Sequence, residues 1–248
     1  MWILLALACQ SDCSEGASCA FDGGAYTVLG ATEATDRAFI YLHGAATNAE
    51  EVRQRHKEER FLEAGYTMVY PDAPNGNWQV SRGLDAAAED AAWVASLAEQ
   101  LRADGVADTF FVGGQSVGGS MTWYVACFEG DGFAGFLPSA GGFWEPLPAS
   151  CPTRSVVLRH SHGLDDNFVP FEGRELGGGA TQGSVAEGLA LWRDELGCDE
   201  AVEESVEGPF TCEAWTGCSG ELELCRYQGG HGTPKGWEVE AVEWLDRH

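Results

Sequence analysis

Short apolar runs and longer helical patterns alternate along nearly the whole chain, and this alternation limits the folds open to it. The short runs have the length and composition of strands, and they lie at residues 26–29, 38–42, 66–70, 109–113, 133–138, 155–159 and 221–227. The longer patterns have the apolar spacing of helices, and they lie at residues 48–63, 84–103, 117–127, 185–196 and 237–245. Strands that alternate with helices assemble into a parallel sheet with helices on both faces. The pattern therefore predicts one α/β domain.

The charge of the chain is strongly negative. Its 39 Asp and Glu residues against 14 Lys and Arg residues give a formal net charge of −25. Such a surface repels phosphate backbones and anionic lipid headgroups, so we expect no nucleic-acid partner and no polybasic docking to membranes. No apolar run approaches the roughly 20 residues that a membrane-spanning helix needs. The apolar and aromatic residues are too many and too evenly spread for a disordered chain.

The nine cysteines and the first residues of the chain indicate export. Residues 1–8 are apolar and end in small residues directly before Cys9, which is typical of a very short lipoprotein signal whose cleavage leaves Cys9 as the lipidated first residue. Residues 9–22 would then be a Cys- and Ser-rich tether, and residues 23–248 the domain. Eight further cysteines allow four disulfides, as expected for a secreted or cell-envelope protein. Because no Lys or Arg precedes the apolar stretch, other exported forms and a cytosolic protein stay open.

The strongest local motif is G-Q-S-V-G at residues 114–118, between the strand at 109–113 and the helix at 117–127. A serine on a sharp strand-to-helix turn exposes its hydroxyl at the carboxyl edge of the sheet, and the flanking glycines keep that turn free of collisions. The motif alone is weak, because short patterns recur by chance. Its place between a strand and a helix favours Ser116 as a nucleophile.

A serine hydroxyl needs a base, and the base needs an orienting acid. On this architecture the expected chain order is serine, acid, histidine. Asp165 and Asp166 follow one predicted strand, and His231 lies in a glycine-rich loop after the last predicted strand. A loop histidine is more often a surface residue, and a loop aspartate more often a turn residue. Three such residues in the right order favour a triad of Ser116, one of the two aspartates and His231.

Backbone amides that could stabilise a tetrahedral oxyanion lie near the same edge. Ala45 follows the strand at 38–42 in a His-Gly-Ala-Ala segment, and Val117 follows Ser116. Acyl transfer needs such preorganised donors, and the removal of one typically costs about 3 kcal/mol of barrier. We therefore expect Ala45 and Val117 to form an oxyanion hole. His43 is interpreted chiefly as a brace for this loop, with a contact to substrate as the alternative.

Several segments together resemble a known family. The segments YLHGAA, YPDAPNGNW, EDAAWVASL, GGQSVGGSM, HGLDDNFVPF, SVAEGLALW and GGHG resemble the secreted α/β-hydrolases that include polyhydroxybutyrate-depolymerase-like and feruloyl-esterase enzymes. The resemblance covers most of residues 25–245 and implies a single α/β-hydrolase domain without a large lid. By its place in an H-G-x-x-D turn, Asp166 is selected as the acid, with Asp165 as the alternative. The chain departs where the family often has Asn after the nucleophile and Trp-Pro soon after the base.

The resemblance implies a serine esterase that needs no cofactor. Ser116 would form an acyl-enzyme, with His231 as the base and Asp166 as the orienting acid. Hydroxyalkanoate polyesters, feruloyl or acetyl esters of polysaccharides, and small soluble esters stay open as substrates. Because no long insertion interrupts the strand pattern, we expect an open cleft that suits a bulky or polymeric ester, and a monomeric protein. Four side chains near the motifs, together with His43, are candidate substrate contacts, with ordinary packing as the alternative: Trp78, Gln115, Phe143 and Trp144.

The later cysteines are expected to form disulfides. Cys127 and Cys151 are a plausible pair, and four more cluster near the His231 loop with their pairing left open: Cys198, Cys212, Cys218 and Cys225. A zinc site built from cysteines is the alternative, but the spacings lack the usual C-x2–4-C pair.

Two other functions stay open. His160-Ser161-His162 followed by Asp165 and Asp166 faintly resembles the zinc motif of a metallohydrolase, but a closing histidine is absent and we expect no metal. Sensitivity to EDTA would favour this alternative. A non-catalytic surface binding protein of the same fold is the other possibility, and the loss of a triad residue would be its mark.

Overall fold

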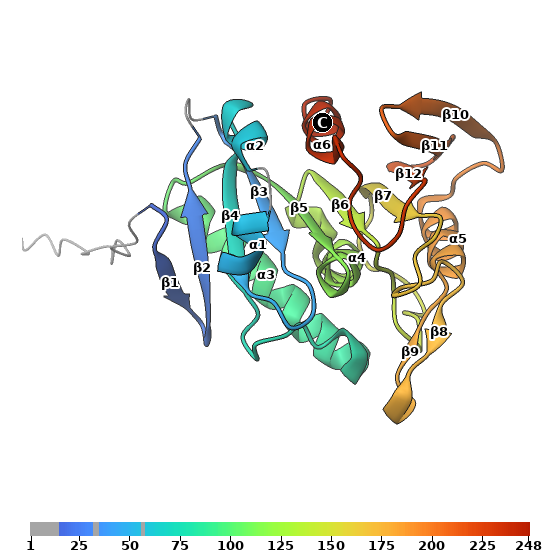
Figure 1. The fold of residues 1–248 in the computed structure, drawn as a ribbon, viewed down its shortest axis with the longest axis horizontal. Helices are drawn as coiled ribbons and strands as arrows, with labels where there is room; N and C mark the ends of the chain where they lie inside the picture. The colour runs from blue at the N-terminus through green and yellow to red at the C-terminus, as the bar shows by residue number, and fades with distance from the viewer. Residues whose placement is uncertain (1–14, 32–34, 56–57) are drawn as a thin grey trace, which may run out of the picture.

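The computed structural model describes residues 15–31, 35–55 and 58–248 (Figure 1). The expected signal segment at residues 1–8 and the lipidation candidate Cys9 lie outside these ranges. Within them, no helix combines the length and the apolar character needed to cross a membrane.

A ten-stranded sheet runs through the domain (Figure 1). Its strands follow one another in space in the order β1 (Ser18–Phe21), β2 (Gly24–Leu29), β4 (Thr67–Asp72), β3 (Arg37–Leu42), β5 (Thr109–Gln115), β6 (Gly135–Ser139), β7 (Val157–Gly163), β12 (Glu221–Tyr227), β11 (Phe210–Trp215) and β10 (Val202–Glu207). The strands from β4 to β12 in this order are parallel, and antiparallel pairs lie at both edges. The carboxyl ends of the parallel strands therefore meet at one edge, where loops can build a site.

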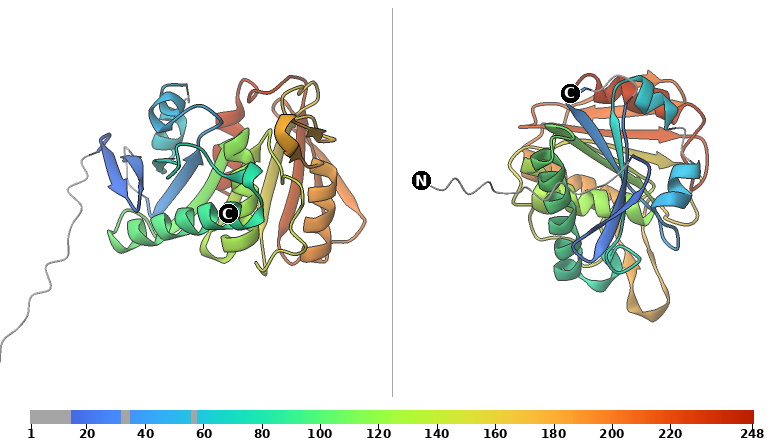
Figure 2. Two further views of the ribbon diagram at one scale, coloured as in Figure 1. Left: turned by 90° about the horizontal axis from the view of Figure 1, so that it is seen from below. Right: turned by 90° about the vertical axis from the view of Figure 1, so that its left-hand side faces the viewer.

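Helices cover both faces of the sheet (Figures 1 and 2). One face carries α3 (Leu84–Ala103), α4 (Val117–Glu129) and α5 (Val185–Leu196), and the other carries α1 (Ala49–Arg55), α2 (Glu59–Glu63) and α6 (Trp237–Leu245). Alternate residues of β3 serve the two cores, because successive strand residues point to opposite faces: Ile40 packs in one cluster and Phe39 in the other. The prediction of one mostly parallel α/β domain with helices on both faces is confirmed.

The short elements outside these layers are small. The 3-10 turns are η1 (Val80–Arg82), η2 (Gly130–Gly132) and η3 (Gly177–Gly179). The hairpin of β8 (Arg174–Glu175) and β9 (Thr181–Gln182) forms a second, two-stranded sheet after β7. Neither set is large enough to be a lid.

Several elements differ from those predicted from the sequence. Ser18–Phe21 forms β1 and pairs antiparallel with β2, so the tether expected at residues 9–22 is wrong for these residues. The helix predicted at 48–63 is two separate helices, α1 and α2. β10 was missed because its sequence, VEESVE, is exposed along nearly its whole length and has no apolar face to give a pattern.

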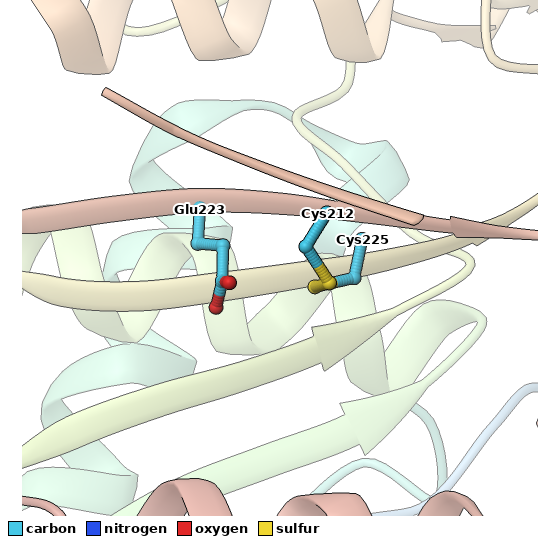
Figure 3. A group of neighbouring side chains, drawn as sticks. All are labelled: Cys212, Glu223 and Cys225. Atoms are coloured by element: carbon cyan, nitrogen blue, oxygen red, sulfur yellow. A yellow bond between two sulfur atoms is a disulfide. The ribbon is translucent and has the colours of Figure 1, made fainter. Parts of the chain in front are cut away.

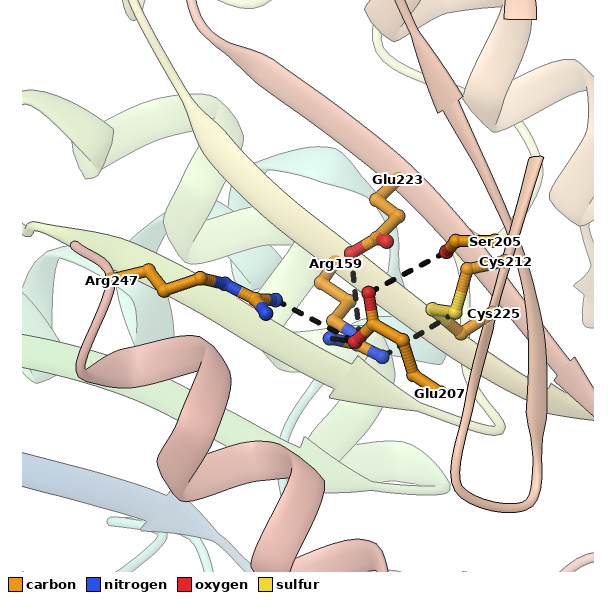
Figure 4. Close-up of a disulfide and its surroundings, with 7 residues drawn as sticks. All are labelled: Arg159, Ser205, Glu207, Cys212, Glu223, Cys225 and Arg247. Carbon is orange, nitrogen blue, oxygen red and sulfur yellow. Dashed lines mark hydrogen bonds and ion pairs between the residues drawn. A yellow bond between two sulfur atoms is a disulfide. The ribbon is translucent and has the colours of Figure 1, made fainter. Parts of the chain in front are cut away.

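A cluster of ion pairs connects β10 with β7 and β12 (Figure 4). Arg159 on β7 is buried, with its Nη1 2.9 Å from Glu207 Oε2 on β10 and its Nε 3.4 Å from Glu223 Oε2 on β12. Arg247 contacts the same Glu207 oxygen at 3.6 Å. Burial acts to raise the pKa of the Glu207 carboxyl, but the charges and hydrogen bonds of the two arginines outweigh it and hold that pKa below its usual value.

Disulfides join several of these elements. The expected bridge between Cys127 and Cys151 is present, which confirms that pairing. The remaining candidates pair as Cys198 with Cys218 and as Cys212 with Cys225, the second across directly opposed residues of β11 and β12. Disulfides of this kind are typical of proteins in oxidising compartments and are compatible with export.

Candidate active site

Ser116 lies on the sharp turn between β5 and α4. Its φ of 61° and ψ of −124° are strained for a residue other than glycine. The glycines of the motif give this turn its room, since a Cβ on Gly118 would lie 2.1 Å from the Leu42 carbonyl oxygen. A Cβ on Gly114 would lie 2.7 Å from the Gly118 carbonyl oxygen. The turn therefore packs directly on the end of β3, and only glycine fits at these two positions.

Asp166 is the aspartate that lies against His231. The His231 Nδ1 atom lies 2.8 Å from Asp166 Oδ2. The other carboxylate oxygen, Oδ1, accepts hydrogen bonds from the backbone amides of Phe168 and Val169 at 2.8 and 2.9 Å, and the Asp166 side chain is fully buried. Asp165 is exposed, and its Oδ2 accepts a hydrogen bond from the Gln228 amide, so the alternative acid is disfavoured. The tight turn sends these two neighbouring side chains in different directions.

Side chains from β5 and β12 hold the loop that carries His231. The Tyr227 hydroxyl donates to the Gly232 carbonyl. The Gln115 amide donates to the His231 carbonyl at 2.5 Å. Gln115 lines the pocket as expected, but its amide nitrogen is bonded to the loop that carries His231.

A pocket of about 580 Å³ contains both Ser116 and His231. Its other lining residues come from the ends of β3, β5 and α1 and from the neighbouring loops: Tyr41, Gly44, Ala45, Thr47, Val52, Arg55, Gln115, Phe168, Gly232 and Thr233. No Asp or Glu lines it in the part of the chain that the structure describes, although the chain contains 39 of them. Among the described residues, the fixed charge on the pocket wall is therefore that of Arg55, which lies 3.9 Å from the Glu51 carboxylate on α1.

Of the two expected oxyanion donors, Ala45 lines this pocket, and Val117 directly follows Ser116, which lines it too. Ala45 is one of its lining residues, in a turn shaped by the positive φ of Ala46, 54°. Across the described residues, no backbone carbonyl accepts a hydrogen bond from the Ala45 amide. Val117 is the first residue of α4, where a helix leaves its amides without an intrahelical acceptor. Both amides can therefore donate to a bound group.

His43 and Trp78 do not lie at the pocket. Each is only 1% exposed, and His43 donates from Nδ1 to the Gly44 carbonyl at 2.8 Å while its Nε2 accepts from the Ala73 amide at 3.2 Å. The Trp78 indole donates to the His43 carbonyl at 3.1 Å. Burial lowers the pKa of His43. Both side chains brace the loop after β3, and the expectation of a substrate contact is wrong for them.

Trp144 and Phe143 are also buried. The Trp144 indole donates to the Ser120 hydroxyl at 3.3 Å, and Phe143 packs edge-on against Trp123 at 5.1 Å between ring centroids. The expectation that they bind an acyl or aryl group is therefore wrong. An aromatic residue that follows a strand near a motif looks the same in sequence whether it faces a pocket or the core.

Phe168 is the aromatic residue that the sequence analysis missed. It is 67% exposed, and its ring centroid lies 5.4 Å from that of His231. Leu164, in the same loop, is 60% exposed. The available signal was an apolar residue in a turn two positions after Asp166, where an exposed polar residue is the usual choice.

Neither group of possible metal ligands is arranged for an ion. His160 Nε2 and His162 Nδ1 lie 3.0 Å apart and bond with each other. Ligand atoms of Cys212, Glu223 and Cys225 lie within 4.8 Å of one another (Figure 3), but the two sulfur atoms are joined in a disulfide. A zinc ion binds thiolates, which that bond removes.

Comparison with known proteins places the fold. No protein-family model and no curated protein matches the chain in sequence. An acetyl xylan esterase from Aspergillus awamori matches in structure with a TM-score of 0.65 and 14% identity, over 91% of this chain and 94% of that one. A carboxylesterase from Mesorhizobium loti matches with a TM-score of 0.66 and 13% identity, over 94% and 99%. The Bacillus cereus carboxylesterase matches with 0.64 and 10%, over 90% and 94%. This protein has the α/β-hydrolase fold.

Proposed function

We propose that this protein hydrolyses carboxylic esters through a serine nucleophile. The observation that carries the proposal is the hydrogen bond between His231 Nδ1 and the buried Asp166, in a pocket that also contains Ser116 on its strained turn. A carboxylate on one ring nitrogen of a histidine fixes the tautomer and leaves the other nitrogen to act on a hydroxyl. The esterase names of the structural neighbours support the same activity.

In the first half of the proposed reaction, Ser116 Oγ attacks the ester carbonyl carbon, and His231 Nε2 takes the proton of the Ser116 hydroxyl. Asp166 stabilises the imidazolium that forms. The amides of Ala45 and Val117 donate to the carbonyl oxygen as it becomes negative. The tetrahedral intermediate then collapses, and His231 gives the proton to the departing alcohol oxygen. An acyl group remains on Ser116.

In the second half, a water molecule attacks the acyl carbon. His231 takes the proton from the water, and the same two amides bind the second oxyanion. Collapse returns the proton to Ser116 Oγ and releases the carboxylic acid. No step calls for a cofactor.

For the substrate we propose a bulky or polymeric ester, either a hydroxyalkanoate polyester or a feruloyl or acetyl ester of a polysaccharide. The β8–β9 hairpin contributes no residue to the pocket wall, and the exposed Phe168 ring offers an apolar contact beside the base. One of the structural neighbours is an acetyl xylan esterase. We further propose a monomeric, exported protein, with its N-terminus lipidated on Cys9.

The test is hydrolysis of p-nitrophenyl butyrate by the wild type, Ser116→Ala and the control Ser96→Ala, an exposed serine on α3. Each is also treated with a fluorophosphonate and, separately, with EDTA. We expect turnover and labelling of the wild type and the control, loss of both in Ser116→Ala, and no effect of EDTA. Full activity of Ser116→Ala, or loss of wild-type activity with EDTA, would contradict the proposal. Acetylated xylan, methyl ferulate and polyhydroxybutyrate then separate the substrate classes.

A further inference from the structure

Trp123, His160 and His162 form a row of buried side chains that leads to the loop that holds Asp166. The proposed reaction does not use the side chains of this row. Trp123 lies on α4, and His160 and His162 lie on β7; none of the three is more than 1% exposed. Trp123 Nε1 is 3.2 Å from His160 Nδ1. His160 Nε2 is 3.0 Å from His162 Nδ1, and His162 Nε2 is 2.9 Å from the Val169 carbonyl oxygen. Every ring nitrogen of the two histidines thus has a protein partner.

The two ends of this row fix the direction of all its hydrogen bonds. An indole nitrogen can only donate, and a carbonyl oxygen can only accept. His160 must therefore accept at Nδ1 and carry its proton on Nε2. His162 must in turn accept at Nδ1 and donate from Nε2 to Val169. Each histidine has one permitted tautomer, and its neighbour in the row enforces it.

The row ends on the turn that fixes the carboxylate of Asp166. The Val169 amide is one of the two that donate to Asp166 Oδ1, at 2.9 Å. The Val169 carbonyl accepts the last bond of the row. His162 Nε2 also lies 3.8 Å from Asp166 Oδ2, the oxygen that bonds with His231. A change in the row therefore acts on the position of Asp166, not on the reacting atoms.

The row also keeps a positive charge away from this carboxylate. A further proton on either ring would have to bind at Nδ1, where a donor already points. The titratable groups that face His162 are His160 on its own strand, Asp166 and Glu172 on the following loop, and His231 on the loop after β12. Burial lowers the pKa of both row histidines, well below the usual value for His160. A charged His162 would compete with His231 for Asp166.

We propose that His162 is a positioning residue for the triad acid, and that His160 and Trp123 serve to lock it in the neutral tautomer that donates to Val169. The inference rests on the proposed function, since it assigns a role in the same reaction. It predicts that a side chain with a donor and an acceptor in the right places can replace His162, whereas an apolar one of similar size cannot. Glutamine is such a replacement, because its amide can accept from His160 and donate to Val169.

The experiment follows the rate at which a fluorophosphonate labels Ser116, from pH 4 to pH 8, in the wild type, His162→Leu and His162→Gln. The rate is corrected for the fraction of folded protein. We expect the plateau rate of His162→Leu to fall at least tenfold. We also expect the midpoint of its acid limb to move down by about half a pH unit or more, because a displaced Asp166 stabilises the imidazolium of the base less well. His162→Gln should stay within about threefold of the wild-type plateau, with an unchanged midpoint.

The midpoint separates positioning from simple structural support. Partial unfolding reduces the amount of reactive protein but leaves the midpoint of the remaining active protein where it was. An unchanged midpoint in His162→Leu, or a His162→Gln variant as impaired as His162→Leu, would overturn the inference. If His162→Leu does not fold, His160→Leu with its control His160→Gln asks the same question, because it leaves His162 in place but removes the donor that fixes its tautomer.

A second measurement needs no variant. Nitrogen-15 NMR of the wild type distinguishes the two tautomers of each histidine, and the inference requires the Nε2–H form of His160 and His162 at pH 7. An Nδ1–H form on either ring would overturn it. Failure of the proposed function has a different signature, which is labelling of Ser116→Ala or no labelling of the wild type, whatever the tautomers. That result would overturn both proposals.

Discussion

The Gln115 side chain donates a hydrogen bond to the backbone carbonyl of His231 at 2.5 Å, so the residue directly before the proposed nucleophile holds the loop of the proposed base. The two residues are 116 positions apart in sequence. The bond ties the carboxyl end of β5 to the loop after β12. It gives a direct reason for the spacing between Ser116 and His231 to be maintained when substrate is absent.

Gln115→Ala should therefore impair the reaction more than it impairs the fold. We expect kcat/KM for p-nitrophenyl butyrate to fall about tenfold, since small displacements of a base have large effects on rate. The free energy of unfolding should fall by only about 1 kcal/mol, as for a typical lost hydrogen bond. Gln79→Ala is the matched control, because its exposed amide also donates to a backbone carbonyl, that of Asn77 at 2.6 Å. Equal kcat/KM losses in both variants would contradict the role of Gln115.

Asp166→Asn should abolish most of the activity, and Asp165→Asn almost none. An asparagine cannot stabilise the imidazolium and leaves the histidine free to take the wrong tautomer, so we expect kcat to fall by about 10³- to 10⁴-fold. Asp165 is exposed, and its loss should change kcat less than twofold. Steady-state kinetics on one p-nitrophenyl ester distinguish the two. Comparable effects of the two substitutions would show that the choice of acid is wrong.

The buried histidines predict how stability depends on pH. Burial lowers the pKa of His160 in the folded state, so below pH about 6.5 the unfolded chain binds more protons than the folded one. The contribution of His160 is full above that pH and is lost as the pH falls toward the folded-state value. His160→Gln removes this pH-dependent contribution. As the pH falls below 6, the free energy of unfolding of the variant should therefore rise relative to that of the wild type by about 1.4 kcal/mol per pH unit. Urea unfolding at pH 7, 6 and 5 measures this slope, and a stability difference that is constant with pH would refute it.

Arg159→Ala should be strongly destabilising. It leaves the carboxylates of Glu207 and Glu223 without the guanidinium that contacts both, and we expect a loss of about 3 kcal/mol, at the lower end for a broken buried ion pair because Glu207 is partly exposed. Arg247→Ala is the control, since Arg247 also contacts Glu207 but is 51% exposed, and its loss should stay below about 1 kcal/mol. Chemical denaturation of both variants gives the comparison. Similar losses would mean that burial of Arg159 does not matter.

Because Arg55 lines the pocket, we expect the enzyme to prefer esters that carry a negative charge. Arg55 is the fixed positive charge among the described residues of a pocket without a lining carboxylate. An exposed attraction of about 1 kcal/mol corresponds to roughly fivefold in kcat/KM. Arg55→Ala should therefore lower kcat/KM about fivefold for p-nitrophenyl hemisuccinate but not for p-nitrophenyl butyrate. Arg53→Ala is the control, because Arg53 does not line the pocket. Both arginines pair with a glutamate on the same helix, Arg53 with Glu50 at 2.6 Å and Arg55 with Glu51 at 3.9 Å. Equal changes for both esters would count against this preference.

Features that depend on neighbouring residues in the chain could be predicted from sequence. The apolar run before Ser116, the glycines around it and the helical pattern after it lie within one short segment, and the structure has β5, a strained turn and α4 there. The apolar runs likewise predicted where the parallel strands lie along the chain, but not their order within the sheet. β10 escaped prediction because its exposed residues leave no periodic trace in hydropathy.

Most features that depend on distant residues could not be predicted from the residues alone. Asp165 and Asp166 are chemically alike and adjacent, so the residues alone left the choice open; the family resemblance favoured Asp166, and the loop packs that side chain against His231. Trp78 and Phe168 both follow predicted strands, yet one is 1% and the other 67% exposed. Which of them faces the pocket depends on the elements that pack around it, and those come from other parts of the chain.

The sequence by itself determined the α/β architecture, the turn that carries Ser116 and the chain order of the three proposed catalytic residues, because short-range periodicity and glycine placement encode them. Only the tertiary structure decided the pairing of Cys212 with Cys225 and the row from Trp123 to His162. The disulfide follows from the register of β11 on β12, and the row from the approach of α4 to β7. Both are contacts between segments far apart in sequence, and the energy that selects them comes from packing and hydrogen-bond satisfaction in the folded interior.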